Sequence, residues 1–152
     1  KVIDNGWGIR KEELKLALTS HATSKINHGD LSNIRSLGFR GEALPSIAAV
    51  SKLTLKSRTE EEGEATEIKS LAGEVSEIKP SGLLFGTTVE VQDLFYCTPA
   101  RLKFLKSKNY ESLLIKRLVQ KFALINFDTE FNLYFDNKSV IKTSLSKTHK
   151  IE

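Results

Sequence analysis

The period of the hydrophobic residues changes twice along this chain, and the change limits the folds it can adopt. Near the start, Leu14, Ala17 and Leu18 recur at the spacing of one helix face, whereas apolar and polar residues alternate from Leu53 onward. Spacings of three and four residues are typical of a helix, and alternation is typical of a half-buried strand. Helical spacing returns after Thr98, so the sequence predicts an α+β protein in which helices pack against a sheet.

Caps, prolines and turn residues set the boundaries of the predicted elements. Thr98 followed by Pro99 is a typical helix start. In a longer helix from about residue 110 to 125, one face carries four apolar residues that we expect to be buried: Leu114, Leu118, Phe122 and Ile125. The other expected elements are a strand ending near residue 4, helices at 11–19, 31–37 and 41–50, antiparallel or mixed strands at 65–71, 74–79 and 87–91 with a turn at 80–82, and a hairpin with strands near 131–135 and 140–143.

Composition excludes several classes of protein. The 152 residues, 39% of them hydrophobic, are enough to bury a core. The longest apolar stretch, residues 43–50, is interrupted by Pro45 and is far shorter than the roughly 18 residues of a membrane helix, so no membrane association is expected. Cys97 is the only cysteine, which favours a reducing compartment, the cytoplasm or, for a eukaryotic source, the nucleus. The three histidines and Cys97 are scattered without metal-ligand spacing, so a zinc site is rejected.

The net charge of +4 is concentrated in one segment. Between residues 99 and 126 there are seven bases and a single acid, Glu111, whereas acids dominate between residues 60 and 79. Clustered Lys and Arg favour a nucleic-acid backbone through a salt-dependent, sequence-independent attraction, and the alternative is a solvated helix face. The predicted DNA contacts are Arg101, Lys103, Lys106 and Lys108.

Three short segments could hold a ligand. In residues 4–8, Asp4 ends a strand and is followed by glycines that let the backbone approach a flat ligand, although a tight turn explains the same pattern. Residues 21–25 place two hydroxyls and an ammonium in one loop, where they could hold an anion or simply be solvated. In residues 38–44, two glycines precede a helix whose N–H groups could face a phosphate, and an ordinary helix junction is the alternative.

Taken together and in this order, these segments resemble the MutL-type DNA mismatch repair ATPases of the GHKL superfamily. The resemblance rests on DNGWGIRKEEL, HATSKI, SLGFRGEAL, GTTVEV and DLFYCTPARLKFL, and it extends from Lys1 to about Thr143. It implies a two-layer α/β sandwich of the Bergerat type, a mixed sheet with helices on one face. Residues 1–146 would then form the ATP-binding domain, and residues 147–152 would begin a linker to a second domain.

The resemblance assigns ATP-binding roles residue by residue. Asp4 would accept the adenine amino proton, and Gly6 and Gly8 would shape the adenine pocket. Thr88 would close the adenine side through its hydroxyl, and a plain strand residue is an equal alternative for it. The phosphates would be held by the lid residues Thr23, Ser24 and Lys25 and by backbone N–H groups of Arg40, Gly41, Glu42, Ala43 and Leu44.

Catalysis in this superfamily is assigned to a glutamate that positions water and an asparagine that holds Mg²⁺, both on a helix upstream of the DNG motif. The chain begins at Lys1 and contains no methionine, so it is expected to be a fragment without that helix, without a catalytic or metal-binding residue, and inactive alone. Glu42 is not assigned the catalytic role.

In the intact protein, the resemblance implies ATP and Mg²⁺ as cofactors and an ATP-ordered lid. It also implies DNA, mismatch-recognition and other repair proteins as partners, and ATP-dependent homo- or heterodimerisation. The alternative is a non-enzymatic DNA-backbone-binding module that uses the basic residues 101–121.

Overall fold

The computed structural model describes residues 1–20, 41–82 and 85–145. The chain divides into two compact units, Lys1–Lys103 and Phe104–Glu152, which we call the sheet unit and the hairpin unit. The prediction that residues 1–146 act as one ATP-binding domain is not tested by this division and stays a prediction. Each unit is described by itself below.

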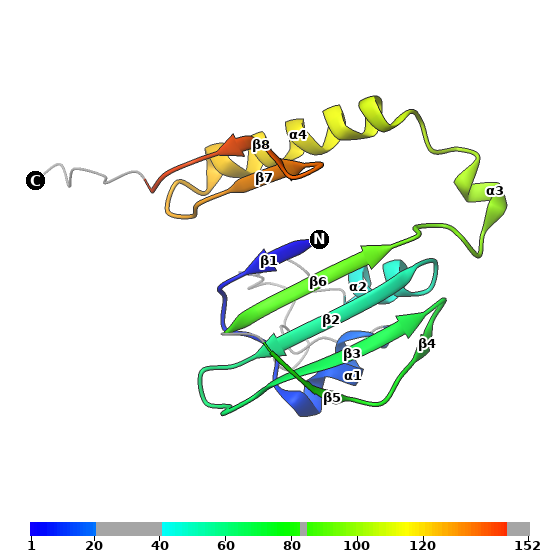
Figure 1. The fold of residues 1–152 in the computed structure, drawn as a ribbon, viewed down its shortest axis with the longest axis vertical. Coiled ribbons are helices and arrows are strands. Elements are labelled where there is room, and N and C mark those ends of the chain that lie inside the picture. The colour runs from blue at the N-terminus through cyan, green and yellow to red at the C-terminus, as the bar shows by residue number, and fades with distance from the viewer. Residues whose placement is uncertain (21–40, 83–84, 146–152) are drawn as a thin grey trace, which may run out of the picture. The chain divides into compact units, whose positions relative to one another are not determined.

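The sheet unit is built on a six-stranded sheet with the order β1-β6-β2-β3-β4, in which β5 also pairs with β3 (Figure 1). The sheet was expected to be antiparallel or mixed, and each of its pairings is antiparallel. Strand β6 therefore lies between β1 and β2, although β1 and β2 come before it in the chain. The strands are β1 (Val2–Asp4), β2 (Lys52–Arg58), β3 (Ala65–Leu71), β4 (Glu74–Val75), β5 (Lys79–Ser81) and β6 (Gly86–Gln92).

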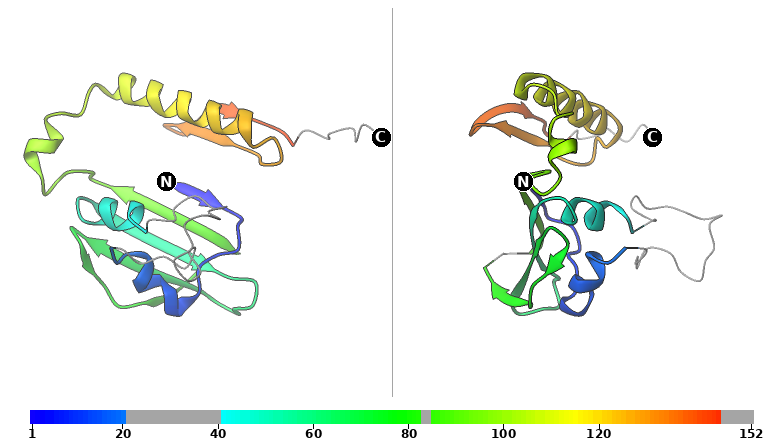
Figure 2. Two further views of the ribbon diagram at one scale, coloured as in Figure 1. Left: turned by 180° about the vertical axis from the view of Figure 1, so that it is seen from behind. Right: turned by 90° about the vertical axis from the view of Figure 1, so that its right-hand side faces the viewer.

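Helices cover one face of this sheet, as the sequence predicted (Figure 2, right). Leu53 and Leu55 of β2 and Ile68 of β3 project from that face and are at most 1% exposed. They pack against Leu14, Leu18 and Ala48 from the helical segments. Among the described residues, the helices of the unit are the 3₁₀ helix η1 (Lys11–Glu13), α1 (Leu14–Ala17), α2 (Ala43–Ala48) and α3 (Pro99–Leu102).

The opposite face of the sheet is polar. Lys56 and Lys69 form ion pairs with Glu67 at 2.9 and 3.2 Å. The hydrogen bond from Lys56 is the largest influence on Glu67 and lowers the pKa of its carboxyl, as does the bond from Lys69, against the opposing effect of burial. The sheet thus has one apolar and one charged face, which is the arrangement that alternation along a strand predicts.

The hairpin unit consists of α4 (Lys108–Ile125), β7 (Asn132–Phe135) and β8 (Lys138–Lys142). Ser107 caps α4 by accepting a hydrogen bond from the N–H of Tyr110 at 3.3 Å. The two strands are antiparallel and are joined at Asp136 and Asn137, both with positive φ. None of the residues described in this unit is buried, so the prediction of a buried apolar face on α4 was wrong here: its four residues, Leu114, Leu118, Phe122 and Ile125, are 40% to 73% exposed.

Most predicted boundaries are confirmed to within a few residues, with two differences. The strand expected at residues 74–79 is divided into β4 and β5, and the turn expected at 80–82 is wrong because Pro80 and Ser81 belong to β5. Strand β5 pairs only with β3, so Pro80 sits on an edge strand where its missing N–H is tolerated. The short helix expected at 31–37 lies outside the described residues. Among the helices that the structure describes, none has the length and apolarity needed to cross a membrane.

Candidate nucleotide site at the end of β1

Asp4 ends β1 and is exposed. Its Oδ1 accepts a hydrogen bond from the N–H of Gly6 at 2.9 Å, which closes a tight turn. A Cβ atom at Gly6 would lie 3.0 Å from the same oxygen, closer than nearly all real Cβ contacts. One carboxylate oxygen is therefore engaged by the turn, and the carboxylate stays accessible from solvent.

Two further glycines let this turn pack directly on backbone. Gly8 has φ +77°, and a Cβ there would lie 2.3 Å from the carbonyl oxygen of Arg58 at the end of β2. Gly86, at the start of β6, has φ +96°, and its Cβ would lie 2.2 Å from the carbonyl oxygen of Asp4. Any side chain at either position would push the segments apart, so these glycines set the shape of the site. The sequence pointed to Gly8 but not to Gly86.

Strand register decides which residues share a face with Asp4. Asp4 pairs with Thr87 of β6, and Thr87 pairs with Ser57 of β2. Residues paired directly across a sheet project from the same face, and Ser57 lies two residues from the core residue Leu55, so all three are on the helix-covered face. Thr88 pairs with Ile3 and Lys56 and projects from the other face.

The sequence selected Thr88, whereas the register places its neighbour Thr87 on the same face as Asp4. Both threonines are more than 90% buried. The role predicted for Thr88 has not been tested with a ligand and remains a prediction.

A buried hydroxyl joins β2, β6 and the segment that follows the glycine turn. Ser57 is 0% exposed, and its Oγ accepts a hydrogen bond from the N–H of Ile9 at 2.7 Å. The same oxygen lies 3.0 Å from the carbonyl oxygen of Gly86 and 3.0 Å from Oγ1 of Thr87. Sequence reasoning missed Ser57, although the alternation through Leu53 and Leu55 puts it on the buried face, where a polar group needs partners.

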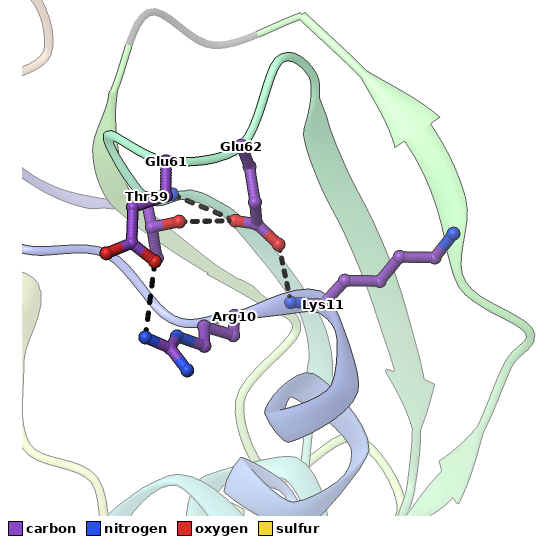
Figure 3. A network of polar contacts seen from close by, with 5 residues as sticks. All are labelled: Arg10, Lys11, Thr59, Glu61 and Glu62. Atoms are coloured by element: carbon purple, nitrogen blue, oxygen red, sulfur yellow. Dashed lines mark hydrogen bonds and ion pairs between the residues drawn. The ribbon is translucent and has the colours of Figure 1, made fainter.

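A second polar network holds the segment that follows Gly8 (Figure 3). The carboxylate of Glu62, in the turn between β2 and β3, accepts hydrogen bonds from the N–H of Lys11 at 2.9 Å and from the N–H and hydroxyl of Thr59 at 3.0 and 2.9 Å. Arg10 forms an ion pair with Glu61 at 3.2 Å.

These bonds favour the charged form of Glu62. The bond from the Thr59 N–H is the largest influence and lowers the pKa of the carboxyl, with smaller lowering from Lys11, the Thr59 hydroxyl and the charge of Arg10, and burial acts in the opposite direction. The network ties the glycine turn to the rigid sheet.

The predicted phosphate-binding residues lie partly in the described structure. Gly41 has φ +63°, Glu42 is the residue before α2, and Ala43 and Leu44 form its first turn. The N–H groups of a first helical turn have no partner within the helix. Leu44 packs against the same core cluster as β2, so α2 lies on the face that carries Asp4 and Thr87. The predicted contacts Thr23, Ser24, Lys25 and Arg40 lie outside the described residues.

The predicted DNA contacts are distributed over both units. Arg101 and Lys103 belong to the sheet unit, and Lys106 and Lys108 belong to the hairpin unit. The ammonium of Lys108 contacts both carboxylate oxygens of Asp136, at 2.9 and 2.7 Å, so it is already paired. A separate groove of about 760 Å³ in the hairpin unit is lined by ten residues, of which four are bases: Lys116, Arg117, Lys121 and Lys142.

Within residues 1–20, 41–82 and 85–145, no group of three or more His, Cys, Asp or Glu side chains is arranged to hold a metal ion. The described part of the site offers a carboxylate, hydroxyls and backbone N–H groups, which can recognise the edge of a heterocyclic base and an anionic tail.

No family model matches the chain, but comparisons with individual proteins give consistent results. The chain is 49% identical over 144 residues to the DNA mismatch repair protein MutL of Clostridium beijerinckii, covering 94% of this chain and 22% of that protein. It is 51% identical over 142 residues to MutL of Haemophilus influenzae strain PittEE, covering 92% of this chain and 23% of the relative. It therefore spans less than a quarter of the length of these relatives.

Solved structures agree with the sequence comparisons. The MutL ATPase domain of Aquifex aeolicus complexed with ADP superposes with a TM-score of 0.76 at 33% identity, covering 95% of this chain and half of that one. A second crystal structure, of the ATPase domain from the mismatch repair endonuclease MutL of Aquifex aeolicus, superposes with a TM-score of 0.73 at 33% identity, covering 95% of this chain and 48% of the other.

Proposed function

This chain belongs to the MutL family of DNA mismatch repair proteins, and we propose that it binds ATP as part of the ATPase domain of such a protein. The arrangement that carries the proposal is the exposed carboxylate of Asp4 beside Thr87, on a turn that Gly8 and Gly86 press against the sheet. The Aquifex aeolicus relative, which shares the fold, is an ATPase domain complexed with ADP. The first observation supports this edge as the site, and the second supports a nucleotide as the ligand.

Asp4 is the proposed acceptor for the adenine amino group. A carboxylate has two oxygens, so Oδ1 can keep its bond to the Gly6 N–H while Oδ2 accepts from the base. Thr87 is the proposed hydroxyl on the adenine side, because it shares the face and the register position of Asp4. Gly6 and Gly8 leave room for the flat base.

The phosphates are proposed to lie near the start of α2. Backbone N–H groups of Gly41, Glu42, Ala43 and Leu44 would face them, together with Arg40 and the lid residues 23–25. Mg²⁺ would neutralise charge on the phosphates when ATP is bound. Since the described residues include no group of metal ligands, we assign no protein ligand for it.

Titration of the chain with ADP tests the proposal. We expect Asp4→Asn to weaken ADP binding by about tenfold or more, since charge-assisted hydrogen bonds contribute roughly 1.5–3 kcal/mol. The amide offers only one acceptor oxygen, and its NH₂ group opposes the amino group of adenine. The matched control is Asp128→Asn, the same change at an exposed residue of the hairpin unit.

A second pair of variants separates the two threonines. Thr87→Val is expected to weaken ADP binding, and Thr88→Val is expected to leave it unchanged, because the two side chains project from opposite faces of β6. Equal ADP affinity in Asp4→Asn and the unmodified chain would refute the proposed site.

In the whole protein, ATP binding is proposed to order the lid over the phosphates and to promote dimerisation. Nucleotide state would thereby be coupled to DNA and to mismatch-recognition and other repair proteins. Hydrolysis of ATP is proposed for the whole protein. Limited proteolysis tests the lid: ATP is expected to protect residues 23–44 from cleavage, and identical digestion with and without ATP would contradict lid ordering.

A second candidate function is binding of a DNA backbone by the basic groove of the hairpin unit. Lys116, Arg117, Lys121 and Lys142 line it, and none of its lining residues is acidic. Each phosphate contact adds about 0.9 to the slope of log affinity against log salt. We expect Lys121→Gln with Lys142→Gln to weaken DNA binding and flatten that slope. Binding that the substitutions leave unchanged would refute this candidate.

A further inference from the structure

We propose that the buried hydroxyl of Ser57 is a positioning residue for adenine recognition, acting through the hydroxyl of Thr87; this inference rests on the proposed nucleotide function. Ser57 lies on β2 and is 0% exposed, so it cannot touch a nucleotide that approaches from solvent. Its Oγ contacts three groups from two other segments of the chain: the N–H of Ile9, the carbonyl oxygen of Gly86 and the hydroxyl of Thr87.

Counting protons shows what Ser57 controls. A serine hydroxyl has one proton to donate, and the N–H of Ile9 can only donate to it. The carbonyl oxygen of Gly86, 3.0 Å away, can only accept, so it receives the Ser57 proton, and the hydroxyl of Thr87, also 3.0 Å away, donates its own proton to Ser57. With its proton held in this way, the Thr87 hydroxyl presents only lone pairs outward.

This arrangement fits adenine. The base-pairing edge of adenine carries the N6 amino donor beside the N1 acceptor, whereas guanine carries an acceptor and an N–H donor at the corresponding positions. Asp4 supplies one acceptor for the amino group, and the Thr87 hydroxyl, whose proton is held by Ser57, supplies a second acceptor toward it, directly or through one water. The oxygen that guanine carries at this position would meet two acceptors and no donor. Ser57 thereby favours the pattern of adenine over that of guanine.

Ser57 also holds the backbone of the site in place. The N–H of Ile9 follows the glycine turn, and Gly86 packs against the carbonyl of Asp4. Both bonds end on the same buried oxygen. Loss of the hydroxyl would leave a partly buried N–H and a buried carbonyl without this partner, which is costly away from water.

Ser70 provides a matched control. It lies on the neighbouring strand β3, is 2% exposed, and projects from the same face of the sheet, but its Oγ has no hydrogen-bond partner. Ser57→Ala and Ser70→Ala thus delete the same atom from equivalent surroundings, and only the first deletion removes hydrogen bonds.

The test measures dissociation constants for ADP and GDP, together with unfolding midpoints, in the full chain. Ser57→Ala is expected to weaken ADP binding by about tenfold and to reduce the preference for ADP over GDP, and Ser70→Ala is expected to change neither. A merely structural role would lower the unfolding midpoint without changing the ratio of the two affinities.

A double-mutant cycle tests whether Ser57 acts through Thr87. The combined Ser57→Ala and Thr87→Val variant is expected to lose little more ADP affinity than Thr87→Val alone, because one interaction is removed in both. Fully additive losses would overturn the proposal. If Ser57→Ala does not fold, Ser57→Cys keeps the volume but weakens the hydrogen bonds, and is expected to weaken ADP binding severalfold; ADP affinity equal to that of the unmodified chain would overturn the proposal.

The unmodified chain separates the two levels of inference. If it does not bind ADP, the proposed function fails and Ser57 falls with it. If it binds ADP and Ser57→Ala binds equally well with the same ADP preference, only the role of Ser57 is refuted.

Discussion

The two units of this chain differ in how far they bury their hydrophobic side chains. In the sheet unit, Leu53, Leu55 and Ile68 are at most 1% exposed, and the core they form is continuous with the helices above it. In the hairpin unit, α4 has 18 residues and none of them is buried, while Leu124 and Ile125 are 82% and 73% exposed.

The difference follows from the number of strands. A sheet of six strands offers a face wide enough to bury side chains from two helices, whereas a two-stranded sheet beside one helix does not. The sheet unit therefore has its own source of stability and can hold a rigid site. The hairpin unit exposes apolar surface that further protein surface could bury.

Substitutions of single leucines make this comparison quantitative. Leu55→Ala removes a fully buried side chain and is expected to lower the free energy of unfolding by about 2–5 kcal/mol. Leu124→Ala, the same change at an 82% exposed position, is expected to stay within about 0.5 kcal/mol of the unmodified chain. Denaturant unfolding measures both. Comparable losses would show that Leu124 is buried in solution.

Two residues with positive φ, one in each unit, allow the next comparison. Gly86 in the sheet unit has φ +96° and no room for a Cβ beside Asp4, so Gly86→Ala is expected to cost at least about 1–3 kcal/mol and to weaken ADP binding. Asn137 in the hairpin unit has φ +63° at the second position of a turn that favours glycine there. Asn137→Gly is therefore expected to be neutral or slightly stabilising.

Thermal unfolding tests the stability predicted for Gly86→Ala and for Asn137→Gly, and ADP titration tests the weaker binding predicted for Gly86→Ala. Gly63→Ala is the matched control, because a Cβ there meets nothing within 4 Å. A Gly86→Ala variant as stable as Gly63→Ala would mean that β1 and β6 can separate freely at this edge.

Local patterns predicted most of the sheet unit but not the burial of α4. Alternation placed Leu53 and Leu55 on one face of the sheet, and Gly6 and Gly8 marked the position of the turn after β1. The apolar face of α4 was equally clear in the sequence, yet burial depends on what lies opposite, which periodicity does not report.

The same limit applies to the threonines of β6. The sequence alone does not distinguish Thr87 from Thr88, because they are identical neighbours in one strand. A register shift of one residue would exchange the faces of the sheet from which they project. Only the pairing of Asp4 with Thr87, and of Thr87 with Ser57, separates them. The burial of Ser57 needed no family pattern, because alternation with Leu53 and Leu55 predicts it, but only the structure shows that Ser57 has hydrogen-bond partners and that Ser70 on the same face has none.

Substitutions of polar residues are expected to show the same contrast between the two units, with smaller changes in the free energy of unfolding. Glu62 accepts three hydrogen bonds in the sheet unit, and Glu62→Gln is expected to cost about 1 kcal/mol at neutral pH. Asp136 pairs with Lys108 in the hairpin unit with both side chains 74% exposed, and Asp136→Asn is expected to cost about 0.2–1 kcal/mol at most.

The pH dependence of the free energy of unfolding shows whether the charged form of Glu62 stabilises the fold. Because the folded-state pKa of Glu62 is below its ordinary value, the unfolded chain binds more protons around that value. The stabilisation is therefore complete above the unfolded pKa of about 4.5 and is lost as the pH falls through the folded pKa. Unfolding curves of the unmodified chain and of Glu62→Gln are expected to converge below pH 4.5, and a constant difference between them down to pH 2 would mean that the charge of Glu62 does not stabilise the turn beside Gly8.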